Sequence, residues 1–135
     1  MIEGVEVRSL PVHRDDRGGL VKVLMRQHLP EGQRTFGEIY ISWAAPGAIK
    51  ANHYHEETTE WFCLLQGRAR LVLEHPTTGE RQEILLDAAE PTVVTVPPGV
   101  AHAVENVGTE PAHLLAYADR PYDPQQPDTI PYRVI

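Results

Sequence analysis

The sequence predicts an all-β domain in which short strands form a barrel or a sandwich. Apolar and polar residues alternate within short runs, which is the period-two pattern of half-buried strands. Turn-forming residues separate these runs, and the chain of 135 residues contains 10 glycines and 12 prolines. No stretch shows a convincing helical period. Frequent turns between short strands are typical of β-barrels and β-sandwiches.

Three strands are predicted in the N-terminal part of the chain. Val5–Leu10 and Leu20–Arg26 are separated by the polar, glycine-containing run Asp15–Gly19. Pro30–Gly32 then interrupts the chain before the strand Glu38–Trp43. Each of the three runs combines aliphatic or aromatic residues with alternating polar ones, which favours strands over helices.

The remaining strands lie between residues 50 and 118, and Pro76–Gly79 forms a hairpin turn among them. A strand is expected to carry the His53–His55 pair. After it we expect strands at Glu60–Leu65, Arg68–Glu74, Gln82–Leu86, Val93–Val96, Ala101–Val107 and His113–Ala118. Both faces of Glu60–Leu65 are apolar, with Phe62 on one and Trp61 on the other. We therefore expect one face to line the barrel and the other to pack on a second sheet or subunit.

We expect one domain over residues 1–135, a length that suits a single core. Within it, N-terminal strands occupy residues 1–36, a core carries the chemistry at about 37–118, and a tail at 119–135 wraps the outside. The net charge of −7 argues against nucleic acid or an anionic membrane as a partner. There is no membrane-spanning apolar run or signal-peptide pattern, and the single cysteine, Cys63, suits a reducing compartment. These features predict a cytoplasmic protein.

Four donor residues at a particular spacing predict a metal site. After Gly47 come five residues, His53, one residue, His55, four residues, Glu60, six residues and Gly67. Pro97-Pro98-Gly99 is followed by two residues and His102. Alternate residues of a strand point to one face, so the imidazoles of His53 and His55 project together. Three imidazoles and one carboxylate bind a divalent metal, and this donor set alone leaves zinc, iron, manganese and nickel open.

These two stretches match the two motifs of the cupin superfamily, although Pro91 stands where a glycine is usual. The resemblance implies a double-stranded β-helix, or jelly-roll barrel. Asn106, which closes the second motif, is expected to fix a turn rather than to touch substrate.

The whole chain also resembles the cupins of nucleotide-sugar metabolism. Asp16–Leu20 and Lys50–His55 are similar to segments of dTDP-4-dehydrorhamnose 3,5-epimerases. Tyr122–Pro124 and Pro127–Thr129 resemble the ending of the C-terminal cupin domain of a bifunctional capsular polysaccharide enzyme. The resemblance implies a zinc-binding epimerase or isomerase of a nucleotide-linked 4-keto-6-deoxy sugar, and a homodimer. The reductase that accompanies that cupin domain would here be a separate chain.

The resemblance also suggests catalytic and substrate-binding residues. His53 and Glu60 occupy positions where the metal-free epimerases carry their base and a lysine, so a different base is expected here. Tyr117 is the first candidate, because it aligns approximately with a tyrosine acid of those epimerases, and the other candidates are His113, Glu38 and Tyr40.

Four cationic residues are candidates for contact with a diphosphate. Arg17 and Lys50 are suggested by resemblance, and Lys50 needs a β-bulge to reach the face of His53. Arg68 and Arg70 share a face and either line a phosphate rim or solvate the barrel exterior. Two alternative functions stay open: a metal-dependent dioxygenase acting on a small molecule, and a non-catalytic sugar-binding cupin.

Overall fold

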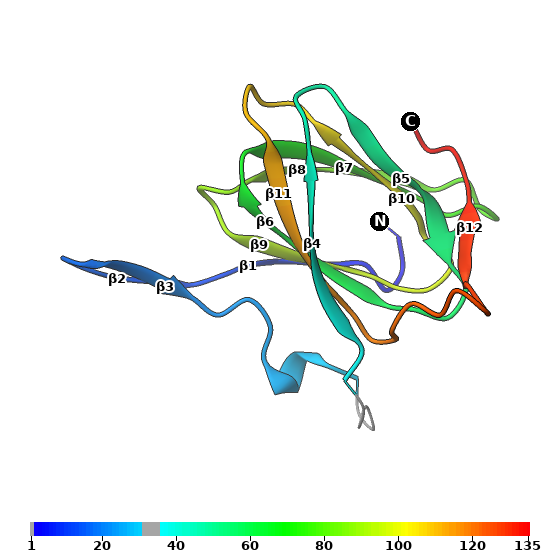
Figure 1. Cartoon of the computed structure of the whole chain (residues 1–135), viewed down its shortest axis with the longest axis horizontal. Coiled ribbons are helices and arrows are strands. Elements are labelled where there is room, and N and C mark those ends of the chain that lie inside the picture. The colour runs from blue at the N-terminus through cyan, green and yellow to red at the C-terminus, as the bar shows by residue number, and fades with distance from the viewer. Residues whose placement is uncertain (1, 31–35) are drawn as a thin grey trace.

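Two five-stranded antiparallel sheets face each other across a shared core (Figure 1). The structure is a computed structural model that describes residues 2–30 and 36–135. The first sheet has the order β1 (Glu6–Ser9), β9 (Thr92–Val96), β6 (Glu60–Gln66), β11 (Ala112–Ala118), β4 (Glu38–Ala44). The second has the order β12 (Thr129–Pro131), β5 (Ile49–His55), β10 (Ala101–Asn106), β7 (Arg68–Glu74), β8 (Arg81–Asp87). The predicted all-β class is confirmed.

Alternation along the strands decides which side chains enter the space between the sheets. Phe62 and Leu64 of β6 point inward and pack with Leu71 and Leu73 of β7, which come from the opposite sheet. Glu60 lies on this same inward face and is 3% exposed. The strand pattern therefore carries a carboxylate into a largely apolar interior, where a charge must be compensated by partners.

The outer face of the first sheet is covered by the chain's own N-terminal segment. Trp61, Cys63 and Tyr117 form a buried cluster there, and partly buried side chains between residues 21 and 29 pack on it. The prediction of a second covered face is confirmed, but its cover is neither a sheet nor a subunit. The predicted strand Leu20–Arg26 ends early for this reason, because Val23 and Leu24 turn onto the cluster.

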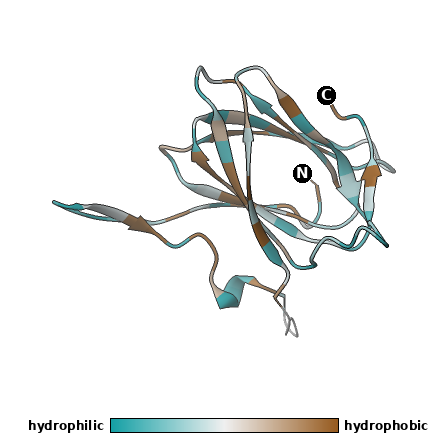
Figure 2. Ribbon diagram, viewed as in Figure 1, coloured by the Kyte–Doolittle hydropathy of each residue, from teal (hydrophilic) through white to brown (hydrophobic). Residues whose placement is uncertain are grey.

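A hairpin of β2 (Val12–Asp15) and β3 (Gly18–Val21) extends away from the barrel as an arm (Figure 1). The predicted turn at Asp15–Gly19 is the tip of this arm, and Figure 2 shows that the tip is hydrophilic. A short 3-10 helix, η1 (Arg26–His28), follows the arm. Of the predicted break at Pro30–Gly32, residues 31 and 32 lie outside the described residues.

The tail does more than wrap the outside, because part of it joins the second sheet as β12. Its register pairs Thr129 with His55 and Pro131 with His53. Beyond β12, Asn52 Oδ1 accepts hydrogen bonds from the amides of Val134 (2.7 Å) and Ile135 (3.1 Å). Proline suits this position because β12 is an edge strand. The tail is thereby placed beside the strand that carries the two histidines.

Candidate metal centre and adjoining cavities

The four predicted metal-binding residues come together inside the barrel mouth. His53 and His55 lie on β5, Glu60 begins β6 and His102 lies on β10. One donor atom from each residue lies within 4.8 Å of the others. Pairing of β10 with β5 sets His102 opposite His53, so the sheet register itself creates the group.

Several polar atoms of this group are buried without a hydrogen bond among the described residues. They are His55 Nε2, His102 Nε2 and Glu60 Oε1. Glu60 Oε1 lies 2.8 Å from His55 Nε2 and 3.5 Å from His102 Nε2. Buried polar atoms are nearly always satisfied, and a divalent cation would satisfy all three at once. His53, His55, Glu60 and His102 therefore fit a metal ion and would be the residues that hold it.

The protonation states of the group suit metal binding. Burial, with the charges of the other two imidazoles, lowers the pKa of His53 to about 4, so this imidazole is neutral at pH 7. Burial alone would raise the pKa of Glu60, but the close approach of the His102 and His55 imidazoles holds it well below its usual range. Burial opposes a charge on His55, yet the nearby Glu60 carboxylate raises its pKa. A bound metal would displace the second ring proton of His55, because ligation needs a neutral imidazole.

β5 contains the bulge that the sequence interpretation required for Lys50. Ala51 and Asn52 have φ of 73° and 57°, and the pairing with β10 shifts register beside them. As a result Lys50 lines the same cavity as His53. Its ammonium donates to Ser42 Oγ (2.7 Å) and to the carbonyl of Trp43 (3.2 Å), neither of which neutralises its charge.

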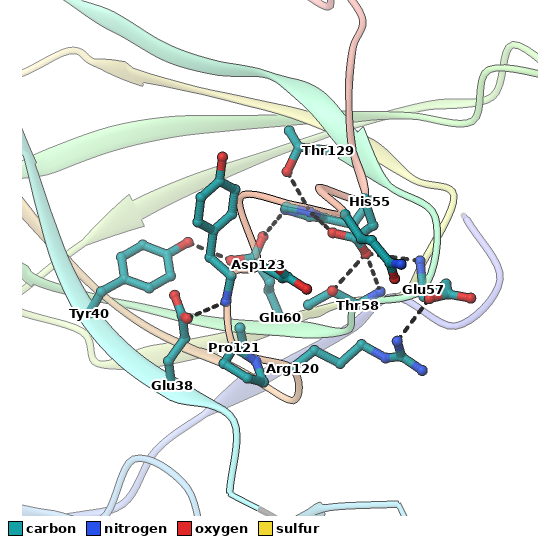
Figure 3. Close-up of a pocket in the computed structure, with 14 residues that line it drawn as sticks. Glu38, Tyr40, His55, Glu57, Thr58, Glu60, Arg120, Pro121, Asp123 and Thr129 are labelled. Atoms are coloured by element: carbon teal, nitrogen blue, oxygen red, sulfur yellow. Dashed lines mark hydrogen bonds and ion pairs between the residues drawn. The ribbon is translucent and has the colours of Figure 1, made fainter.

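Two cavities adjoin the group on different sides. The larger, about 520 Å³, is lined by His55 and Glu60 and by residues of the tail (Figure 3). The smaller, about 170 Å³, contains His53, His102 and Lys50. Tyr40 lines both.

Two of the four catalytic candidates, Glu38 and Tyr40, lie in the larger cavity (Figure 3). The Tyr40 hydroxyl donates a hydrogen bond to Glu60 Oε2. Burial and the charge of Glu60 raise the pKa of Tyr40, so it stays a neutral donor. Glu38 Oε1 accepts a hydrogen bond from the Tyr122 amide at 2.5 Å.

Tyr117 and His113 line neither of the two cavities beside the candidate metal group of their own chain, so their catalytic role stays a prediction. Inward positions on β11 are taken by residues such as Leu114 and Ala116. Tyr117 faces outward onto Trp61, and its hydroxyl accepts a hydrogen bond from the Gly37 amide at 3.2 Å. His113 stacks on Trp43, whose side chain is largely exposed.

The three arginine candidates also lie away from both cavities of their own chain. Arg17 sits at the arm tip and pairs with Asp15 at 2.6 Å. Arg70 pairs with Glu83 (2.9 Å) and Glu105 (3.0 Å), and Arg68 lies 3.9 Å from Asp87. For Arg68 and Arg70 the structure supports the barrel-exterior alternative.

The tail contributes site residues that were not predicted. It lines the larger cavity with Arg120, Pro121, Tyr122, Asp123, Gln126, Asp128 and Thr129. Asp128 and Thr129 approach His55 Nδ1 at 3.4 Å and 3.3 Å. The similarity of the tail to a sugar-enzyme ending was the signal that could have identified them.

Comparison with known proteins agrees with this geometry. The family described as the polysaccharide biosynthesis C-terminal domain matches residues 13–130. The chain belongs to this family. The spore coat polysaccharide biosynthesis protein SpsL of Bacillus subtilis is 34% identical, over 95% of this chain and 87% of that protein.

Two further relatives of this polysaccharide biosynthesis domain carry more specific names. A Haloferax volcanii protein named "Probable low-salt glycan biosynthesis epimerase Agl13" is 32% identical over 97% of this chain and 88% of its own length. The UDP-2-acetamido-2,6-beta-L-arabino-hexul-4-ose reductase of Pseudomonas aeruginosa is 32% identical over 90% of this chain. The match spans only 31% of that reductase, so the shared part is one domain of a longer enzyme.

A solved structure confirms the fold of this polysaccharide biosynthesis domain. The dTDP sugar isomerase of Desulfovibrio desulfuricans G20 superposes with a TM-score of 0.83 at 24% identity, covering 99% of this chain and 85% of that one. The predicted cupin jelly roll is thereby confirmed, and the Haloferax volcanii relative agrees with the predicted kinship with epimerases. The described residues contain no helix long and apolar enough to cross a membrane.

Proposed function

We propose that the protein is an epimerase or isomerase of a nucleotide-linked 4-keto-6-deoxy sugar in polysaccharide biosynthesis. The observation that carries this proposal is a single cavity in which Glu38 and Tyr40 accompany His55 and Glu60 of the metal group. Such a cavity combines a carboxylate, a neutral hydroxyl and a cation site, which are the groups that proton transfer beside a ketone needs. The names of two relatives support polysaccharide biosynthesis and epimerisation, and the name of the Pseudomonas aeruginosa reductase supports a UDP-linked 4-keto sugar as the substrate class.

The chemistry assigned to the chain's own residues is a proton exchange at the carbon next to the sugar ketone. The ketone acidifies that carbon–hydrogen bond. Glu38 removes the proton as a carboxylate, and the electron pair moves onto the ketone oxygen as an enolate. Tyr40 donates its hydroxyl proton to the opposite face of that carbon as the enolate returns to the ketone, which inverts the centre and leaves a tyrosinate. Solvent exchange then restores both residues.

A divalent metal held by His53, His55, Glu60 and His102 would supply Lewis acidity toward the ketone oxygen, and zinc is our first expectation. Zinc suits three imidazoles and one carboxylate, and iron, manganese and nickel also accept these donors.

Lys50 is the cation that we propose for the diphosphate. The larger cavity has a mainly acidic wall, because Glu57, Asp123 and Asp128 outnumber Arg120, whose guanidinium pairs with Glu57 at 2.8 Å. This excess of negative charge disfavours an anion there. The smaller cavity offers the Lys50 ammonium beside His53. The two cavities would thus divide the substrate, with the sugar on the side of Glu38 and the phosphates on the side of Lys50.

We also propose a homodimer. The outward side chains of β4 are apolar and exposed: Ile39 is 58% exposed, Ile41 51% and Trp43 63%. β4 is an edge strand, and exposed apolar edges usually meet a partner. Arg17, at the arm tip, could contact substrate only in another copy. Light scattering should give twice the chain mass for the native protein and a monomer mass for Trp43→Glu, and a monomeric native protein would contradict the proposal.

Incubation with UDP- and dTDP-linked 4-keto-6-deoxy sugars, with product NMR and an oxygen electrode in parallel, tests the reaction class. The proposal expects an inverted ring carbon and no oxygen consumption. Oxygen uptake with a redox-active metal would favour the dioxygenase alternative. Binding of these sugars without turnover would favour the sugar-binding alternative. The separate reductase stays a prediction, and it would be detected as a chain that consumes the product of this reaction.

A further inference from the structure

The C-terminal tail reaches the metal group through one carboxylate, Asp128, which lies just before β12. Its Oδ2 accepts hydrogen bonds from the amides of Glu57 and Thr58, both at 3.1 Å, and from Thr58 Oγ1 at 2.8 Å. This oxygen is therefore fully committed to the loop between β5 and β6. Its Oδ1 points instead to His55, with 3.4 Å to Nδ1.

The ring of His55 is held between the tail and the metal group. On one side its Nδ1 meets Asp128 Oδ1 and, at 3.3 Å, Thr129 Oγ1. On the other side its Nε2 lies 2.8 Å from Glu60 Oε1. A neutral imidazole offers a lone pair at one nitrogen only, so Nε2 can ligate a cation only when the proton sits on Nδ1. A carboxylate at Nδ1 favours that tautomer.

We propose that Asp128 is a positioning residue that holds His55 in the Nδ1–H tautomer, so that the C-terminal tail is part of the metal centre. The inference deepens the proposed function and rests on the same metal group. His102 is oriented in a parallel way, since its Nδ1 lies 3.2 Å from the Val100 carbonyl. The difference is that the partner of His55 comes from a segment more than 70 residues away in the sequence. Correct ligation at His55 thus depends on docking of the tail.

Substitution Asp128→Asn separates positioning from anchoring. Three donors face the Oδ2 position, so the amide oxygen of Asn must occupy it and the amide NH₂ must face His55. His55 Nδ1 then has to accept, and its proton moves to Nε2. Zinc affinity should fall about 10- to 100-fold. The urea midpoint of unfolding should stay near the native value, because the three loop hydrogen bonds are retained.

Asp119→Asn is the matched control, since Asp119 caps the same loop by accepting from the Thr59 amide at 3.0 Å. It removes the same charge from the same region without a contact to the histidines, and should leave zinc affinity unchanged. Thr129→Val removes the other neighbour of His55 Nδ1 and should change affinity far less than Asp128→Asn.

The deciding readout is the tautomer of His55 by nitrogen NMR on the metal-free protein at alkaline pH, with zinc affinity from chelator competition as the second. Nδ1–H in the native protein and Nε2–H in Asp128→Asn would support the proposal. Nε2–H in the native protein, an unchanged tautomer in the variant, or a larger effect of Thr129→Val would overturn it. If the tautomers change as expected but neither the native protein nor any variant binds zinc, the proposed metal function fails and the positioning role of Asp128 stands.

Discussion

The hydroxyl of Tyr40 donates a hydrogen bond to the carboxylate of Glu60, and this contact joins the larger cavity to the candidate metal group. Tyr40 comes from the edge strand β4 and Glu60 from β6, with β11 between them. The hydroxyl therefore lies where the two cavities meet, and Tyr40 lines both. One side chain in this way contacts a candidate metal ligand and faces both cavities.

Replacement Tyr40→Phe should lower kcat about 10²- to 10⁴-fold, since a positioned acid or base contributes that much. It also leaves Glu60 Oε2 without its donor, so we expect a loss of about 1–3 kcal/mol in the free energy of unfolding. Steady-state kinetics and urea titration measure the two effects. A variant with native kcat would remove Tyr40 from the mechanism.

Replacement Glu60→Ala should abolish binding of the divalent metal, because it removes the carboxylate and leaves an incomplete donor set. The native protein should hold about one equivalent after dialysis against zinc, and a chelator should lower its unfolding midpoint. Elemental analysis gives the metal content. His13→Ala, on the exposed arm, is the control and should keep the metal. Equal metal content in both variants would refute the site.

Replacement Ala51→Gly should stabilise the fold. Ala51 has φ of 73°, a left-handed conformation that is unfavourable by about 1–2 kcal/mol for a residue with a Cβ. Glycine removes that strain, and its larger unfolded-state entropy cancels part of the gain. We expect a net increase of up to about 1 kcal/mol. Ala45→Gly, at an exposed position without positive φ, should instead be neutral or destabilising. A less stable Ala51→Gly would contradict the strained bulge.

Acid should destabilise the metal-free protein through His53. Its folded pKa is about 4 against an ordinary 6.5, mainly because of burial. Between these values the unfolded chain binds a proton that the folded chain does not, so stability falls as the pH drops from 6.5 toward 4. Glu60, whose pKa is lowered in the fold, adds to the loss below its ordinary value of 4.5. The raised pKa of His55 acts in the opposite sense. Its contribution to the free energy of unfolding is complete below pH 6.5 and is lost only as the pH rises above that value.

Urea midpoints at pH 7 and pH 5 measure this dependence, and His53→Gln should lose less stability between them than the native protein. An equal loss in both proteins would assign the acid sensitivity to other groups.

The sequence was sufficient for the features that depend on local pattern. Period-two alternation placed the inner strands, since a strand fixes which neighbours share a face. The spacing of His53, His55, Glu60 and His102 identified the four residues that the fold brings together as a candidate metal group. The need for a bulge before His53 also followed from counting alternate residues to Lys50.

Features that depend on distant segments could not be predicted in the same way. Tyr117 belongs to a strand with two apolar faces, and its outward direction is set by packing on Trp61 and on residues 21–29. The proposed positioning of His55 by Asp128 requires that β12 pairs with β5, and no local pattern in the proline-rich tail predicts this pairing. Resemblance indicated that the tail mattered but not where it docks.

Deuterium exchange tests the central claim most directly. The native protein, Glu38→Gln and Tyr117→Phe would each be incubated in deuterium oxide with UDP- and dTDP-linked 4-keto-6-deoxy sugars, and the ring carbons beside the ketone followed by NMR. The structure predicts enzyme-dependent exchange at one such carbon in the native protein and in Tyr117→Phe, and its loss in Glu38→Gln. Absence of exchange in the native protein with every sugar, or full exchange by Glu38→Gln, would contradict proton abstraction in this cavity.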